Sequence, residues 1–161
     1  MLTKKIIYTG ADGNLYLVYP AENDKQPSET EDQFITRIRN KDVPPTAVES
    51  VVVDTNIALP PRNLRKGWSW NNVTSSVDLH LGRTRSAILE QVRQKRDSLL
   101  DDSDKMKAKV DDIGTALQKT QVATYRQQLR DLPQTIQDEI APLNKAQLSV
   151  YVPSYPLIPN V

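Results

Sequence analysis

The chain has 161 residues, enough for one domain of ordinary size or two small ones, and hydrophobic residues make up 38% of it. Its 21 Lys and Arg against 20 Asp and Glu give a formal net charge of +1, so no whole-molecule field favours nucleic acid or an anionic membrane as a partner. The absence of cysteine excludes disulfides and thiolate sites, and no apolar stretch approaches the ~20 residues that span a bilayer, so we expect a soluble protein.

Residues 1–20 are expected to form a β-hairpin. Apolar runs at 6–8 and 15–19 are each long enough for one strand. Asp12-Gly13 lies between them, and this pair supplies the positive φ angles that a tight hairpin turn needs. Pro20 ends the second strand because it has no N–H to donate to a ladder.

A short helix is predicted next, from about Glu29 to Asn40. Ser28 and Glu31 have the spacing of a capping box, and apolar residues follow at helical intervals. Pro44-Pro45 prevents the helix from continuing.

Further strands are predicted on both sides of a proline-containing loop. The β-branched run at 50–54 is typical of a strand. Trp68 and Trp70 alternate in an extended segment, which places both indoles on one face. Residues 73–79 follow the turn signal Asn71-Asn72 as a return strand.

Beyond His80 the composition is typical of helices, with apolar residues at spacings of three and four. The predicted stripe comprises Leu81, Ile88, Val92, Leu99, Met106, Val110, Ile113 and Leu117, then Val122, Tyr125, Leu129 and Leu132. Asp101–Asp104 opposes the macrodipole at a helix end and suits a helix start, so we expect a break there. Gly114, followed by a Thr115–Gln118 capping box, predicts a second break. Pro133 is expected to open a short further turn.

The chain is expected to end in an extended apolar segment from about Leu148. Pro153, Pro156 and Pro159 have the three-residue period of polyproline II. Because the segment cannot form a core of its own, we expect it to dock in a groove or along a sheet edge of a partner. The alternative is that it folds back over the N-terminal sheet of its own chain.

These elements predict an α+β fold: a small N-terminal β-hairpin and sheet module with one short helix, followed by a helical hairpin and an extended C-terminal tail. We place the boundaries at 1–79 for the α+β module, 80–140 for the helical hairpin and 141–161 for the proline-rich tail.

Residue patterns for catalysis are not found in the sequence. His80 is the single histidine, with no second His, Cys or patterned carboxylate nearby. Asp101–Asp104 begins like a calcium loop, but neither its glycine nor its closing glutamate follows. Residues 10–13 are too short for a phosphate loop and lack its lysine. We therefore expect no metal, no cofactor and no enzymatic activity.

The first long helix has a basic side, formed by Arg83, Arg85, Arg93, Lys95 and Arg96. Acidic residues follow at once and no aromatic residue is interleaved, so a solvated face is favoured over a nucleic-acid site.

Two segments of the helical region resemble a known family. Residues 93–104, RQKRDSLLDDSD, look like the R-x-x-R-D-x-L-L-x-x-S/T-D segment of phage tail assembly chaperones. Residues 125–133, YRQQLRDLP, are similar to their Y-R-Q-x-L-R-D-L-P segment, in the same order and at a similar spacing. The sequence departs from the family at 105–107 and 121–124, where the family often has a tryptophan.

The resemblance implies a non-enzymatic bacteriophage protein that acts in tail or tail-fibre assembly in the host cytoplasm. Its expected partner is a tail-fibre or baseplate protein, without nucleic acid or membrane, and homo-oligomer formation within an assembly stays open. The alternative is a permanent structural component of the virion tail, baseplate or fibre. A second alternative, based on the basic helix, is a nucleic-acid-binding regulator.

The residues expected to bind the partner are aromatic or apolar. Aromatic side chains are favoured interface anchors, although core packing explains the two tryptophans equally well. The candidates are Trp68, Trp70, Tyr151, Val152, Tyr155, Leu157 and Ile158.

Overall fold

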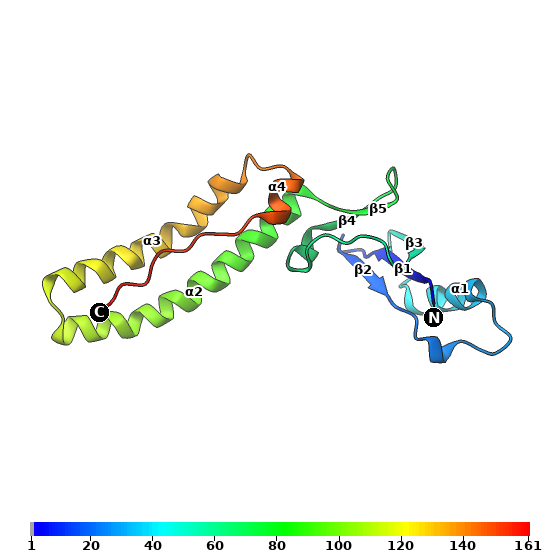
Figure 1. Cartoon of the computed structure of the whole chain (residues 1–161), viewed down its shortest axis with the longest axis horizontal. Coiled ribbons are helices and arrows are strands. Elements are labelled where there is room, and N and C mark those ends of the chain that lie inside the picture. Colours follow the sequence, from blue (N-terminus) through cyan, green and yellow to red (C-terminus); the bar gives the residue numbers. More distant parts are fainter. Residues whose placement is uncertain (1) are drawn as a thin grey trace. The chain divides into compact units, whose positions relative to one another are not determined.

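The computed structural model describes residues 2–161 and confirms the α+β class. Antiparallel sheets and one short helix come first in the chain, and long helices follow (Figure 1). The described residues form two compact units, one ending at Arg83 and the other running from Thr84 to Val161. Met1, with which the expected α+β module begins, lies outside the described residues. The division of the chain after residues 79 and 140 stays a prediction.

The three-stranded sheet of the N-terminal unit contains β1 (Lys4–Thr9), β2 (Leu15–Val18) and β3 (Glu49–Asp54), in the order β2-β1-β3. All its strand pairs are antiparallel, which confirms the predicted hairpin and third strand. Gly13 has a φ of 75°, in the left-handed region that glycine tolerates. The Asp12 carboxylate accepts the main-chain N–H two residues further on at 3.0 Å. This local turn sets the register of β1 against β2.

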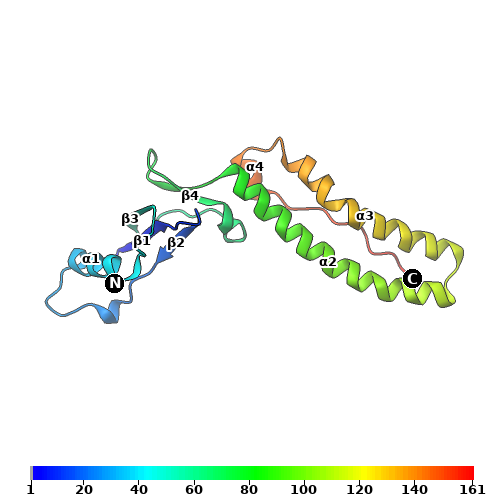
Figure 2. The same ribbon diagram turned by 180° about the vertical axis from the view of Figure 1, so that it is seen from behind.

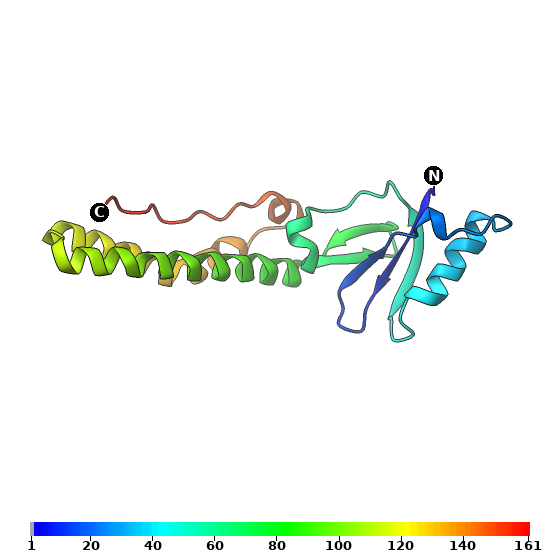
Figure 3. The same ribbon diagram turned by 90° about the horizontal axis from the view of Figure 1, so that it is seen from below.

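Helix α1 (Glu31–Asp42) confirms the predicted short helix, but its cap differs from the expected one. Thr30, not Ser28, is the N-cap. Its Oγ1 accepts the N–H of Gln33 at 3.2 Å, and the Gln33 side chain accepts the N–H of Thr30 at 2.9 Å. The helix lies beside the sheet (Figure 3), and the core of this part comprises Ile6, Phe34, Ile35 and Ile38.

A second hairpin follows in the N-terminal unit. Strands β4 (Trp68–Asn71) and β5 (Ser76–Leu79) pair antiparallel, which confirms the predicted return strand. Two short 3-10 helices, η1 (Glu22–Asp24) and η2 (Arg62–Gly67), lie in the connecting segments.

Helix α2 (Leu81–Ile113) is continuous, so the break predicted at Asp101–Asp104 is wrong. Ser103 is buried, and Arg126 of the next helix donates hydrogen bonds to its Oγ at 2.6 Å and to Asp104 at 2.5 Å. The two helices therefore pack and bond through the acidic segment. That contact outweighs an unfavourable dipole interaction of only ~0.3–1 kcal/mol.

The break predicted at Gly114 is confirmed, and α3 (Ala116–Ile140) begins directly after it. Thr115 caps α3 by accepting the N–H of Gln118 at 3.3 Å. Glycine is required at the turn, because a side-chain carbon on Gly114 would lie 2.5 Å from the carbonyl oxygen of Val110.

Pro133 lies inside α3 and does not open a new turn, which corrects the sequence-based expectation. A proline within a helix removes one hydrogen bond and costs ~3 kcal/mol. The apolar face nevertheless continues across it, with Val122, Tyr125, Leu129, Leu132, Ile136 and Ile140 all buried. Burial of Leu132 and Ile136 beside the proline, at ~1.5–3 kcal/mol each, offsets that cost.

The segment 141–161, expected to be extended, begins with a short helix, α4 (Lys145–Val150). It forms because Asn144 caps it. The Asn144 Oδ1 accepts the N–H of Gln147 at 3.0 Å, and the Gln147 side chain accepts the N–H of Asn144 at 2.9 Å. The chain is extended only beyond α4, and we call residues 151–161 the C-terminal strap.

Candidate partner-binding surface

Residues that could carry chemistry have structural roles in this fold. His80 accepts the N–H of Arg83 through Nδ1 at 3.3 Å, at the start of α2. Asp104 of the acidic segment bonds to Arg126. Within residues 2–161, no three His, Cys, Asp or Glu side chains are grouped so that they could hold a metal ion. Nor does any helix in that range have the length and apolar character needed to cross a membrane.

Three of the five residues on the expected basic side of α2 are engaged within the chain. Arg83 donates hydrogen bonds to two main-chain carbonyl oxygens of the N-terminal unit. Arg85 does the same with two carbonyl oxygens at and after the end of α3, at 3.2 and 3.0 Å. Arg96 lies 2.8 Å from the carboxylate of Asp97. Arg93 and Lys95 remain exposed, so two of the five basic residues stay available at the surface.

Trp68 and Trp70 occupy alternate positions of β4 and differ in exposure. Trp68 is buried, and its indole N–H donates to the Pro61 carbonyl oxygen at 3.3 Å. Trp70 is half-buried, and its indole N–H donates to Asn72 Oδ1 at 2.8 Å. Trp68 thus serves the core of the N-terminal unit, whereas Trp70 keeps surface that a partner could contact.

The C-terminal strap lies along one side of the hairpin formed by α2 and α3 (Figures 1 and 2). It is held near both ends. The Tyr151 hydroxyl donates to Glu139 at 2.6 Å, and the Lys109 ammonium donates to the carbonyl oxygen of Val161 at 3.0 Å. The strap therefore folds back over the helical hairpin of its own unit, an arrangement that neither expectation described.

The two tyrosines of the strap contact this hairpin. Burial raises the pKa of the Tyr151 hydroxyl, and its hydrogen bond to Glu139 raises the pKa further. Burial also raises the pKa of Tyr155. A groove of about 540 Å³ between α3 and the strap is lined by Gln128, Leu132, Thr135, Glu139, Ser154, Tyr155, Pro156 and Leu157. The tyrosines expected to anchor a partner are thus engaged with their own chain.

Apolar residues in and next to the strap are exposed instead. The exposed fractions are 77% for Val150, 82% for Val152, 92% for Leu157 and 59% for Ile158. The last three are among the sequence-derived candidates. Val150 was not among the candidates. It is the last residue of α4, and the capping-box spacing of Asn144 and Gln147 is the sequence signal that could have predicted this helix. We call these four residues the outer apolar row.

Two further exposed apolar residues lie at the turn between α2 and α3. Ile113 and Leu117 were expected on the buried stripe, but both are exposed. The turn at Gly114 interrupts the helical periodicity, so these side chains do not follow the seam into α3.

The comparisons with known proteins concern the helical part of the chain. Residues 89–153 match a family model described as "Phage tail assembly chaperone protein". The match covers most of α2, all of α3 and α4 and the start of the strap, and it includes both motifs quoted above. Comparisons with curated proteins and with solved structures give no match. Over residues 89–153 the chain is thus similar to the phage tail assembly chaperone family, and this similarity supports a role in tail assembly.

Proposed function

We propose that this protein promotes the assembly of a bacteriophage tail or tail fibre by binding a fibre or baseplate subunit on the outer apolar row, without catalysing a reaction. The observation that carries the proposal is that the strap holds its tyrosines against its own hairpin and leaves apolar side chains exposed. Tyr151 bonds to Glu139 of α3 and Tyr155 lines the groove beside α3, while Val152, Leu157 and Ile158 remain exposed. Exposed apolar side chains gathered in one segment are typical of a partner-binding surface.

The way the strap is held supports this role. A peptide that is already extended and attached to its own chain loses little conformational freedom when a partner binds. Its prolines also keep it in the extended form that grooves and sheet edges accept. Burial of Leu157 alone would contribute ~1.5–3 kcal/mol, which corresponds to roughly 10-fold to 100-fold in affinity.

Leu157→Asp tests the proposal, with Val73→Asp as the matched control. Both residues are more than nine-tenths exposed, at 92% and 94%, and Val73 lies in the β4–β5 turn of the N-terminal unit. Neither substitution should change the melting temperature. We expect Leu157→Asp to abolish both complementation of a tail-assembly defect and capture of the fibre or baseplate protein, while Val73→Asp retains both. Normal assembly with Leu157→Asp would reject the proposed surface.

The fate of the protein separates the proposal from its alternative, a permanent component of the tail, baseplate or fibre. The outer apolar row would serve either role, because both need a bound partner. We propose that the protein acts transiently in the host cytoplasm. Mass spectrometry of purified virions decides between them. Stoichiometric peptides from this chain would assign it to the virion, and their absence would support a transient chaperone.

A further inference from the structure

Strand β3 forms an edge of the three-stranded sheet, where β1 is its neighbour in the order β2-β1-β3. The N–H of Thr55 donates to the carbonyl oxygen of Thr3 at 2.8 Å, which identifies the hydrogen-bonded pairs of the β1–β3 ladder. Bonded and non-bonded pairs alternate in an antiparallel ladder. The main-chain N–H and C=O groups of Ser50, Val52 and Asp54 therefore point away from β1.

A groove of about 640 Å³ lies beside this edge. It is lined by Val51, Val52, Val53, Asp54, Asn56, Ile57, Trp70, Asn72 and Ser75. One wall is thus β3 with the turn that follows it, and the other is β4 with the turn toward β5. The Val52 side chain is 40% exposed, and Trp70 on the opposite wall is half-buried. An extended peptide in this groove would contact both walls.

The middle of the edge lacks the residues that usually prevent strand addition. In ESVVVD the residues from Ser50 to Val53 include no proline and no charged side chain, and the two acidic residues lie at the ends. Two outward carbonyl groups are already used, since Arg39 donates to Ser50 O at 2.8 Å and Ile57 N–H donates to Asp54 O at 3.2 Å. Both main-chain groups of Val52 point into the groove, so pairing would centre on that residue.

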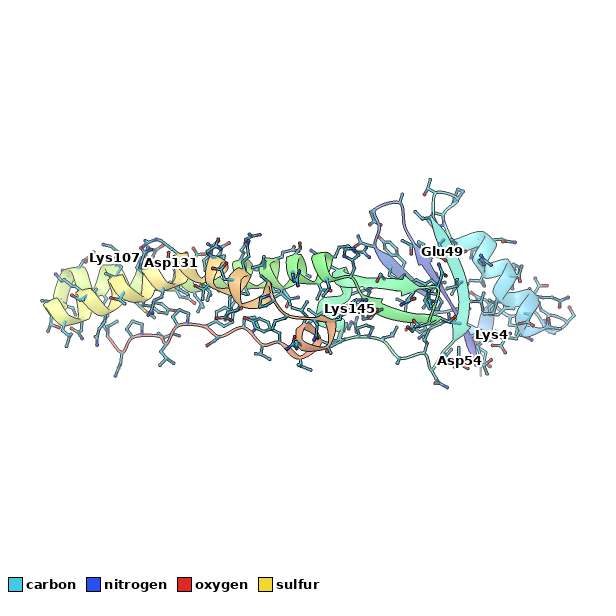
Figure 4. The ribbon with its side chains drawn as sticks, turned by 90° about the horizontal axis from the view of Figure 1, so that it is seen from above. Lys4, Glu49, Asp54, Lys107, Asp131 and Lys145 are labelled. Carbon is cyan, nitrogen blue, oxygen red and sulfur yellow. The ribbon has the colours of Figure 1, made fainter. Side chains whose placement is uncertain are left out.

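We propose that the β3 edge binds an extended segment of a partner polypeptide as an added strand, with β-branched residues facing the groove and a basic residue next to Asp54. Of the residues that line the groove, only Asp54 is charged. Lys4, which lies opposite Asp54 in the ladder, forms its ion pair with Asp32. Figure 4 shows Asp54 at one end of β3 and Glu49 at the other. A cation on the added strand would therefore complement the acidic end of the edge.

A second copy of this chain fits the edge less well. In two β3 strands paired about Val52, each end of the ladder would hold the Asp54 of one copy and the Glu49 of the other, and β3 has no basic residue to offset these charges. That pairing would also use the Ser50 carbonyl to which Arg39 is bonded. The occupant is thus a different polypeptide. This site lies outside the family-matched residues and does not depend on the strap.

Val52→Pro tests the proposal, with Val52→Thr as the matched control. Proline removes only an N–H that points away from β1, so the β1–β3 ladder is kept, and proline is tolerated at such edge positions. The probe is a synthetic peptide with blocked ends, Lys-Thr-Val-Thr-Val-Thr-Val, titrated into the isotope-labelled full chain and followed by amide NMR. We expect the amide signals of Ser50, Val52 and Asp54 to shift. Binding should weaken about tenfold or more with Val52→Pro and change less than about twofold with Val52→Thr.

A second variant keeps the test decisive if Val52→Pro fails to fold, as judged by circular dichroism. Asp54→Asn retains an oxygen that can accept the N–H of Asn56 but loses the charge. It should weaken binding of the lysine peptide and leave unchanged the binding of a peptide with serine in place of lysine. Lack of binding to the wild-type chain, equal binding by Val52→Pro, or signal shifts confined to other surfaces would overturn the proposal. A dimer that Val52→Pro dissociates would assign the edge to a second copy and also overturn it.

Discussion

Leu129→Ala tests whether the seam between α2 and α3 stabilises the C-terminal unit. Leu129 is 0% exposed, whereas Leu117 on the same helix is 69% exposed and provides the matched control. Removal of three buried carbons costs ~0.8 kcal/mol each in transfer free energy, and the cavity left behind adds to this. We expect Leu129→Ala to lower the free energy of unfolding by ~2–5 kcal/mol and Leu117→Ala by no more than ~0.5 kcal/mol.

Two optical signals separate the two units in this experiment. Both tryptophans, Trp68 and Trp70, lie in the N-terminal unit, so their fluorescence reports on that unit. Far-ultraviolet circular dichroism is dominated by the long helices of the other unit. The dichroism midpoint in urea should fall by about 1 M or more for Leu129→Ala, while the fluorescence midpoint changes little. Equal dichroism midpoints for Leu129→Ala and Leu117→Ala would refute the seam.

Two further predictions concern pH. Because the folded-state pKa of Tyr151 is raised from 10.0 by burial and by Glu139, its contribution to stability is complete below pH 10 and is lost as the pH rises through the folded-state pKa. Tyr151→Phe should remove that alkaline loss from the dichroism melting temperature, and an unchanged pH profile would contradict the prediction. The hydrogen bond from Arg37 lowers the pKa of Glu29 from 4.5 to about 2, so its contribution is present above pH 4.5 and is lost as the pH falls toward 2. Glu29→Gln should flatten the fluorescence-monitored stability of the N-terminal unit across that window, and a slope equal to that of the wild type would contradict it.

Local sequence signals determined several elements of this fold. Asp12-Gly13 specified the first hairpin, because few residues adopt the positive φ that its turn requires. Gly114 and Thr115 specified where α2 gives way to α3, since the required glycine and the helix cap are adjacent in sequence. The two family motifs likewise pointed to the region that the family model matches. Each of these features depends on residues within a few positions of one another.

Tertiary contacts decided the rest. The acidic segment and Pro133 predicted helix ends, yet both lie inside long helices because each helix buries an apolar face against its neighbour. Val152 and Tyr155 were equivalent candidates in the sequence, and only the placement of the strap on the α2–α3 hairpin makes one exposed and the other half-buried. The sequence likewise did not reveal that β3 would be an edge strand, because strand order depends on which strands pair. Local signals contribute about 1 kcal/mol each, whereas burying an apolar face contributes several times more, so packing prevails where the two disagree.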